Sequence, residues 1–328
     1  MSKVSVIIPT YNGEKFIGRA IQSVLGQTLR DFEIIVVDDA SRDGTVLKVK
    51  ELAKNDKRIK LTVLPVNTGG PAVPRTVGCK AAQGDLIAFL DQDDMYLPKY
   101  LEKKVAYFDR HPEINLISSW AWMFDEKTKK IIDCGGGGPV NTMARKEVLP
   151  AVGYFKASQN NVDDAAMRHR YNKVYGTEKE LVFEDSDGPL TLYSRNATQE
   201  SAMVRRNPQV FIKRIDSLLA EIDPDESPSP RNRLSRLYSR KGNCYCLMGE
   251  FSTGRHFFAE SLKQEFNIFA LALFAASFLP WFYGAFESLF RIFQSKIIAW
   301  ARVFRKRIKF EKSYRSVKRI LAIVEAGK

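Results

Sequence analysis

Apolar and polar residues alternate in blocks along the first hundred positions of this 328-residue chain. Short apolar runs rich in β-branched residues, each closed by proline, glycine or aspartate, predict buried strands at residues 4–8, 33–37, 59–64 and 86–90. Between the strands, apolar residues recur at helical spacing, as in residues 16–25. Because strands that alternate with helices in this way form largely parallel sheets, we predict an α/β fold with a mainly parallel sheet and helices on both faces.

The pattern is less regular beyond residue 94. A helix is expected at residues 97–108, a strand at 114–123, a short helix at 144–152 and another helix from 161 to 176. The glycine run at residues 135–138 predicts neither a helix nor a strand.

A proline-rich stretch at residues 224–230 predicts a linker. It separates a first domain, residues 1–223, from a helical hairpin at residues 231–265. The spacing of small and aromatic residues in the hairpin is similar to one tetratricopeptide unit, and an ordinary helical hairpin explains it equally well. Apolar and amphipathic basic helices, forming a membrane-interface segment, are expected at residues 266–328.

Positive charge gathers near the end of the chain. The whole chain has 51 Lys and Arg against 38 Asp and Glu, a net charge of +13, and residues 291–319 alone carry eleven basic residues and one acid. Basic residues opposite an apolar, aromatic stripe indicate an anionic membrane surface rather than a nucleic acid. Residues 266–286 carry no charge and have the length of a membrane span, but Pro280 interrupts them, and packing on the protein itself is a third possibility.

The start of the chain and its cysteines bear on location. No secretory signal is visible at the N-terminus, and the four cysteines lack the spacing of zinc ligands, which fits a reducing compartment. We therefore expect a cytoplasmic protein held peripherally on the inner face of the plasma membrane.

Candidate chemistry follows three of the predicted strands. Since ligands of parallel sheets bind beyond the carboxyl ends of the strands, these segments are expected at one shared edge. Three carboxylates in the last segment repel one another, and a divalent cation bound through oxygen ligands, together with a diphosphate, would neutralise that charge; a solvated acidic turn is the alternative. The three segments are Thr10-Tyr11-Asn12, Asp38-Asp39 and Asp91-Gln92-Asp93-Asp94.

Taken in order and spacing, three stretches of the chain resemble the family 2 glycosyltransferases. The resemblance is close over about the first 100 residues and looser to about residue 200. It implies a GT-A fold, a nucleotide-sugar donor that is usually a UDP-sugar, and a Mg²⁺ or Mn²⁺ ion. The stretches are Val4-Ser5-Val6-Ile7-Ile8-Pro9-Thr10-Tyr11-Asn12-Gly13, Glu33-Ile34-Ile35-Val36-Val37-Asp38-Asp39-Ala40-Ser41-Arg42-Asp43-Gly44-Thr45 and Gly84-Asp85-Leu86-Ile87-Ala88-Phe89-Leu90-Asp91-Gln92-Asp93-Asp94.

The resemblance also implies roles for residues on the nucleoside side of the donor. By this resemblance Pro9, Thr10 and Tyr11 line the base pocket, and Asp39 accepts a hydrogen bond from the uracil ring.

Further roles are implied near the diphosphate. Asp91 lies near the ribose and sugar with Gln92 beside it, and Asp93 is the metal ligand. Arg75 approaches the diphosphate, although Pro74 before it and Thr76 after it depart from the family's usual pattern.

The acceptor half of the resemblance rests on residues 162–170. By the resemblance Asp164 is the catalytic base, with Asp163 as the alternative, while Ala165 and Ala166 replace bulkier or acidic family residues. A helix N-cap explains the acidic pair almost as well. The Gln-x-x-Arg-Trp signature of processive synthases is absent from the sequence, which favours single additions.

The predicted reaction is therefore an inverting, metal-dependent transfer of a sugar from a UDP-sugar to a hydroxyl of a saccharide or lipid-linked acceptor, for cell-surface glycan assembly. Two alternatives stay open: a membrane-attached module that binds nucleotide-sugars without turnover, and a sugar nucleotidyltransferase. The second would need a glycine-rich, basic phosphate loop after the first strand, which residues 9–13 do not supply.

Overall fold

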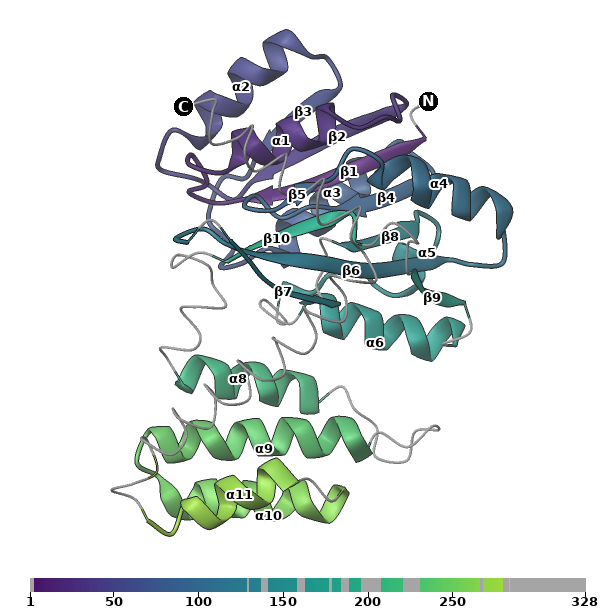
Figure 1. The fold of residues 1–328 in the computed structure, drawn as a ribbon. Helices are drawn as coiled ribbons and strands as arrows, with labels where there is room; N and C mark the ends of the chain where they lie inside the picture. The colour runs from purple at the N-terminus through teal and green to yellow at the C-terminus, as the bar shows by residue number, and fades with distance from the viewer. Residues whose placement is uncertain are drawn as a thin grey trace. The chain divides into compact units, whose positions relative to one another are not determined.

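The computed structural model describes residues 3–128, 130–136, 141–157, 163–176, 179–183, 189–195, 208–220, 231–265, 268–279 and 283. They fall into two compact units, an α/β unit within Met1–Asn196 and a helical unit within Ala197–Trp300 (Figure 1). The linker expected at residues 224–230 and most of the segment expected at 266–328 lie outside the described residues.

Four parallel strands form the first half of the sheet, and they match the four predicted apolar runs. Their order is β3 (Ile59–Val63), β2 (Phe32–Asp38), β1 (Val4–Thr10) and β4 (Leu86–Phe89). Every residue of β1, β2 and β4 is buried, as strands covered on both faces require. Because the strands are parallel, their carboxyl ends meet at one edge.

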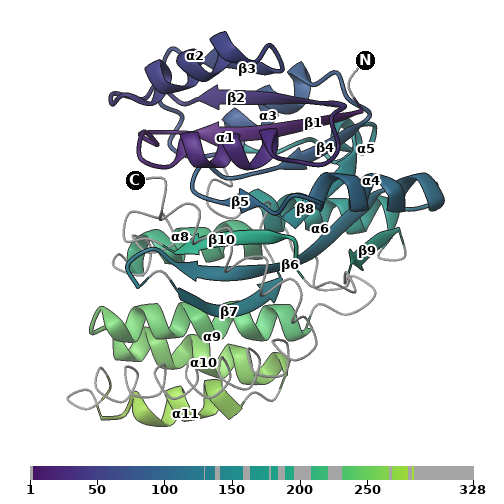
Figure 2. The same ribbon diagram turned by 45° about the horizontal axis from the view of Figure 1, so that its top comes forward.

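Helices cover both faces of this sheet, as predicted. Even-numbered apolar residues of β1 such as Val6 and Ile8 belong to the core under one set of helices, whereas Ile7 belongs to the core under the other. Figure 2 shows α1 in front of β1 and α3 behind it. The first set is α1 (Ile17–Leu25), α2 (Thr45–Asn55) and α4 (Tyr100–Arg110); the second is α3 (Ala72–Ala81), α5 (Val148–Ala151) and α6 (Asp163–Tyr175).

The second half of the sheet is mixed. Strand β8 (Thr142–Arg145) runs antiparallel to both β4 and the long strand β6 (Leu116–Asp125), which joins the two halves. Parallel to β6 run β9 (Glu180–Phe183) and β10 (Thr191–Arg195). The two-residue strand β5 (Met95–Tyr96) is antiparallel to β10.

Two expectations for this half were wrong. The helix expected at residues 144–152 is only α5, because Ala144 belongs to β8 and pairs with both Ile87 and Leu116. The glycine run begins inside a strand, β7 (Lys130–Gly136), where Gly136 lies opposite Trp120 of β6.

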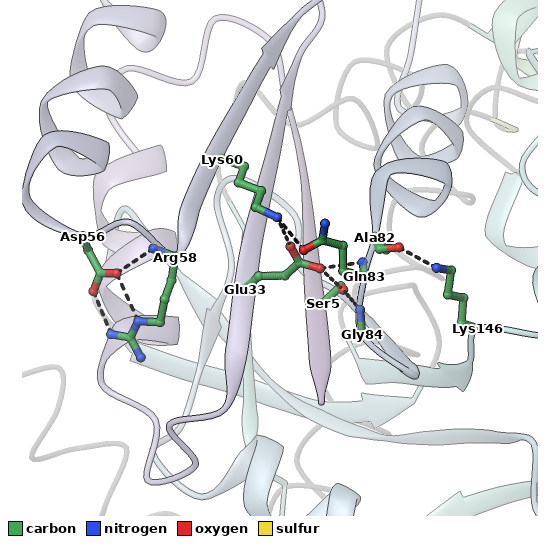
Figure 3. A network of polar contacts seen from close by, with 9 residues as sticks. All are labelled: Ser5, Glu33, Asp56, Arg58, Lys60, Ala82, Gln83, Gly84 and Lys146. Carbon is green, nitrogen blue, oxygen red and sulfur yellow. Dashed lines mark hydrogen bonds and ion pairs between the residues drawn. The ribbon is translucent and has the colours of Figure 1, made fainter. Parts of the chain in front are cut away.

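A buried carboxylate ties together the amino ends of the parallel strands (Figure 3). Glu33, 3% exposed, accepts hydrogen bonds from Ser5 Oγ (2.5 Å), the Gln83 backbone N–H (2.7 Å) and Lys60 Nζ (2.7 Å). Ser5 Oγ in turn accepts the N–H of Gly84 at 2.9 Å. These bonds lie at the end of the sheet opposite the carboxyl edge, so they stabilise the fold without touching the candidate site.

The second unit consists of helices α8 (Pro208–Leu219), α9 (Arg231–Leu247), α10 (Phe251–Gln264) and α11 (Ile268–Ala276). Helices α9 and α10 form the expected hairpin, turning at Gly249, whose φ of 85° favours glycine. A Cβ at Gly242 would lie 2.8 Å from the carbonyl oxygen of Gly254, so only small residues allow the two helices to approach this closely. The likeness to a tetratricopeptide unit stays a prediction.

Helix α11 is apolar throughout, with one side packed on α10. Leu271, Phe278 and Leu279, in and just after this helix, remain 42–59% exposed. Within the described parts of the chain, no helix combines the length and apolarity needed to cross a bilayer.

Candidate active site

Three loops leave the carboxyl edge of the parallel strands and contact one another. Thr10 ends β1 and Tyr11 follows it, Asp39 follows β2, and residues 91–94, here called the acid loop, follow β4. The backbone N–H of Asp39 donates to Thr10 O at 2.8 Å, which joins the first two loops. Pro9 is buried within β1 beside Val37, at the base of the site. The structure therefore brings the residues predicted on these three strands to one edge.

Gln92 joins the acid loop to the loop after β1. Its Oε1 accepts hydrogen bonds from Thr10 Oγ1 (2.6 Å) and from the Tyr11 backbone N–H (2.9 Å), and its Nε2 donates to Tyr11 O at 3.2 Å. The Tyr11 ring is 42% exposed. Gln92 thus holds the loop after β1 with both ends of its amide.

Arg75 reaches the acid loop from the other side. It belongs to α3, is 3% exposed, and its Nη2 donates to Asp91 Oδ1 at 2.5 Å. Its guanidinium lies 5.7 Å from the centre of the Phe155 ring. Thr76 anchors that segment, since its Oγ1 donates to Phe155 O at 2.8 Å. Thr76, which departs from the family's pattern, therefore supports the position of Arg75, and sequence reasoning missed Phe155.

Asp39 is a buried carboxylate that receives donors from the loop after β3. Thr68 donates its backbone N–H (3.0 Å) and Oγ1 (2.8 Å) to Asp39 Oδ1, and Asn67 Nδ2 donates to Oδ2 at 3.1 Å. These donors join the end of β2 to the loop after β3.

The turn beside Asp39 is strained. Ala40 has a φ of 59°, in the left-handed region that alanine rarely adopts, and Asn12 has a φ of 46°. The Asn12 N–H donates to Ser41 Oγ at 2.8 Å, and Asn12 Oδ1 accepts the Arg42 N–H at 2.9 Å. These bonds lock the loops after β1 and β2 together, and unusual backbone of this kind is typical of functional sites.

The end of the acid loop is buried against residues distant in sequence. Asp94 is fully buried, and its Oδ1 accepts the Ser194 backbone N–H at 2.7 Å. Burial raises the pKa of Asp94 well above its usual value, and the neighbouring charges of Asp93 and Asp91 raise it further. Arg19 of α1 donates from Nη2 to the backbone oxygen of Asp93 at 2.8 Å. Sequence reasoning missed Arg19 and Ser194, because 74 and 100 residues separate them from their partners.

The oxygen atoms here fit a hard divalent cation that is partly bound by its substrate. Asp94 Oδ2 is buried and has no hydrogen-bond partner, and Asp91 and Asp93 place further carboxylates in the same loop. Among the described residues, no three acidic, histidine or cysteine side chains could hold a metal by themselves. Mg²⁺ and Mn²⁺ sites often use one or two carboxylates and complete the shell with phosphate oxygens and water, which matches this arrangement.

The predicted catalytic base lies on another element. Helix α6 begins at Asp163, so Asp163 and Asp164 occupy its first turn. Their side-chain positions lie outside the described part of the chain, so the choice between the two carboxylates stays a prediction.

The amino-acid sequence is similar to those of known glycosyltransferases. The family described as "Glycosyl transferase family 2" matches residues 5–174, just over half of the chain. The chain is 41% identical over 113 residues to the poly(ribitol-phosphate) beta-N-acetylglucosaminyltransferase TarS of Staphylococcus aureus, covering 34% of this chain and 20% of TarS. It is 32% identical over 161 residues to an uncharacterized glycosyltransferase of Haemophilus influenzae, covering 48% of this chain and 50% of that protein. The chain thus spans between a fifth and a half of the length of these relatives.

Solved structures share the fold. A 1–349 fragment of S. aureus TarS in complex with UDP-GlcNAc superimposes with a TM-score of 0.62 at 21% identity, covering 88% of this chain and 91% of that one. A mannosyltransferase from Pyrobaculum calidifontis, in complex with GDP-Man and Mn²⁺, superimposes with a TM-score of 0.58 at 17% identity, covering 94% and 86%. The mixed α/β unit therefore has the predicted GT-A fold.

Proposed function

Because the chain belongs to glycosyl transferase family 2, we propose that it transfers a sugar from a UDP-sugar to a hydroxyl group of a saccharide or lipid-linked acceptor, for cell-surface glycan assembly. The main support is that the loops after β1, β2 and β4 are hydrogen-bonded to one another at the carboxyl edge of the parallel strands. Gln92 ties the acid loop to Thr10 and Tyr11, and Arg75 ties it to α3. A nucleoside and a diphosphate need such groups side by side.

The base is the first part of the donor to consider. The acceptor-only carboxylate of Asp39 favours the imide N–H of uracil, and the exposed ring of Tyr11 offers a stacking surface. Cytosine presents an acceptor at the corresponding position and is disfavoured. Guanine also presents N–H donors, so a GDP-sugar is the competing donor to test. The TarS fragment bound to UDP-GlcNAc supports uridine, and the mannosyltransferase bound to GDP-Man keeps guanosine in the comparison.

The diphosphate lies beside the acid loop in this proposal. Asp93, assisted by Asp91, would hold a Mn²⁺ or Mg²⁺ ion, whose positive charge offsets the charge that develops on the departing nucleoside diphosphate. The guanidinium of Arg75 neutralises Asp91 and so lowers the net negative charge beside the same oxygens. Asp164, or Asp163 in its place, removes the proton from the acceptor hydroxyl as that oxygen attacks the sugar carbon from the opposite face. The sugar is thereby transferred with inversion in a single displacement.

We also infer peripheral attachment at the anionic inner face of the plasma membrane. Support comes from the exposed side chains Leu271, Phe278 and Leu279, followed in sequence by the basic residues between positions 291 and 319. A catalytic unit at that surface would meet a lipid-linked acceptor.

The main proposal is tested by measuring nucleoside diphosphate release from a panel of UDP- and GDP-sugars with Mn²⁺, with and without saccharide acceptors. We expect UDP release that EDTA abolishes and Mn²⁺ restores. Asp164→Asn should lower turnover by roughly 10²- to 10⁴-fold with UDP binding retained. Asp163→Asn is the matched variant that identifies which carboxylate acts as the base.

Other outcomes favour the alternatives. Metal-dependent UDP binding without turnover on any acceptor favours the binding module. Formation of a nucleotide-sugar from a nucleoside triphosphate and a sugar phosphate would contradict the transferase and favour a nucleotidyltransferase.

A further inference from the structure

Arg19 holds the acid loop from the face of the sheet opposite Arg75. It belongs to α1, whereas Arg75 belongs to α3, and these helices cover opposite faces. Its Nη2 donates to Asp93 O at 2.8 Å, to Glu126 Oε1 at 2.5 Å and to Ser194 Oγ at 3.1 Å. One guanidinium therefore joins α1, the acid loop, the turn between β6 and β7, and strand β10.

These contacts restrain the backbone on which the predicted metal ligand lies. The carbonyl oxygen of Asp93 is held by Arg19, and the next side chain, Asp94, is held by the Ser194 N–H at 2.7 Å. The loop closes on itself through the Asp94 N–H, which donates to Asp91 O at 3.1 Å. Together with the Gln92 bridge, these bonds fix the acid loop from two sides.

Glu126 makes Arg19 a structural cation rather than a ligand for phosphate. The Arg19 and Glu126 side chains are only 18% and 13% exposed, so each charge depends on the other in a partly dry environment. All three of its bonds come from Nη2, which is therefore occupied by protein oxygens, and Nε is buried. The contacts of Arg19 thus act on the loop.

We propose that Arg19, paired with Glu126, is a positioning residue that sets the direction of the Asp93 carboxylate toward the cation and the diphosphate. The proposal rests on the proposed function for the identity of the ligands. It requires no contact between Arg19 and the donor. Groups that orient a metal ligand from behind commonly contribute 10- to 100-fold to metal affinity.

The test separates metal binding from nucleoside binding in the full chain. Mn²⁺ affinity is measured by electron paramagnetic resonance with saturating UDP, and uridine binding without metal is measured by calorimetry. Arg19→Met, which keeps an unbranched stem and removes the guanidinium, should weaken Mn²⁺ binding by roughly tenfold or more, with uridine binding unchanged. Arg19→Lys should restore part of the loss, and Glu126→Gln should act in the same direction as Arg19→Met.

Arg58→Met is the matched control. Arg58 is also ion-paired, to Asp56 at 2.7 Å, but it lies just before β3 at the amino ends of the strands (Figure 3). It should leave both affinities unchanged. Mn²⁺ binding by folded Arg19→Met or, where that variant does not fold, by Glu126→Gln at the wild-type level would overturn the positioning role.

Hydrogen exchange distinguishes this failure from failure of the proposed function. In Arg19→Met, the backbone amides of residues 93–95 should exchange faster than in the wild type, whether or not a nucleotide binds. Wild-type protein that binds neither UDP nor Mn²⁺ would refute the proposed function. Unchanged exchange in the acid loop would refute the role of Arg19.

Discussion

The side-chain amide of Gln92 occupies the space that a Cβ atom on Gly13 would need. Such an atom would lie 2.2 Å from Gln92 Oε1 and 2.7 Å from Thr10 Oγ1. Gly13→Ala should therefore displace Gln92 and break its bonds to Thr10 and Tyr11. Loss of these three hydrogen bonds, at about 1 kcal/mol each, should raise the Kd for UDP by roughly tenfold or more, as measured by calorimetry.

A double variant tests whether Gly13→Ala acts through Gln92. Gln92→Ala should weaken UDP binding to a similar extent, and adding Gly13→Ala to it should cost little more, because the clash is gone. Gly18→Ala is the matched control, since its Cβ would meet only the flexible end of Lys48 at 3.0 Å. Additive losses in the double variant would contradict the proposed clash.

Asp39 should make the protein prefer uracil over cytosine. Asp39→Asn places an amide where Thr68 and Asn67 donate, so one donor must face another. We expect UDP binding to weaken by about 1–3 kcal/mol. The wild type should bind CDP far more weakly than UDP, and the variant should lose most of that preference. Equal binding of CDP and UDP by the wild type would show that Asp39 does not read the base.

Glu33 should make stability depend on pH. Burial raises its pKa, but bonds from Lys60, Ser5 and the Gln83 N–H outweigh burial, and the net pKa lies below the ordinary value of 4.5. A lowered pKa stabilises the fold above the ordinary value, and that stabilisation is lost as pH falls through the lowered pKa.

Glu33→Gln tests this directly. At neutral pH it should lower the free energy of unfolding by about 2 kcal/mol, and the difference from the wild type should shrink as pH falls below 4.5. UDP affinity at neutral pH should not change, because Glu33 lies at the opposite end of the strands. Asp109→Asn, which removes the exposed ion pair with Lys3, is the control and should change stability by less than about 0.5 kcal/mol.

Ala40→Gly should make the folded protein more stable. Its φ of 59° costs an L-residue about 1 kcal/mol, whereas glycine adopts it without strain. The greater freedom of glycine in the unfolded chain offsets part of this gain, so Ala40→Gly should stabilise the protein by about 0.5 kcal/mol in chemical denaturation. Ala53→Gly, inside helix α2, should instead destabilise it by about 1 kcal/mol.

Membrane binding should depend on the exposed apolar residues after α11. Replacing Phe278 and Leu279 with serine should reduce binding to vesicles that contain anionic lipid, measured by sedimentation, by roughly tenfold. High salt should weaken the wild-type interaction because the basic segment contributes. Leu47→Ser is the control, since Leu47 is 68% exposed on α2 in the other unit. An equal loss with Leu47→Ser would indicate nonspecific adsorption.

The elements that local sequence patterns specify were predicted well. The four parallel strands are continuous apolar runs ended by proline, glycine or aspartate. Such runs are typical of strands that are buried on both faces. Their carboxyl ends necessarily share an edge, so the positions of Thr10, Asp39 and Asp91 followed from the strand pattern alone. The short strands β5 and β7 were missed because two residues, or a run ending in glycines, carry no periodic pattern of their own.

By itself, the sequence determined the α/β class, the edge that carries the polar residues and their types, because these depend on neighbouring residues along the chain. Only the tertiary structure decided which side chains restrain the acid loop. The contacts of Arg19 with Asp93, Glu126 and Ser194 join residues that are 74 to 175 positions apart. No local sequence pattern predicts contacts over such separations. The physical reason is that a hydrogen bond depends on distance in space, which packing of the sheet sets only after the chain has folded.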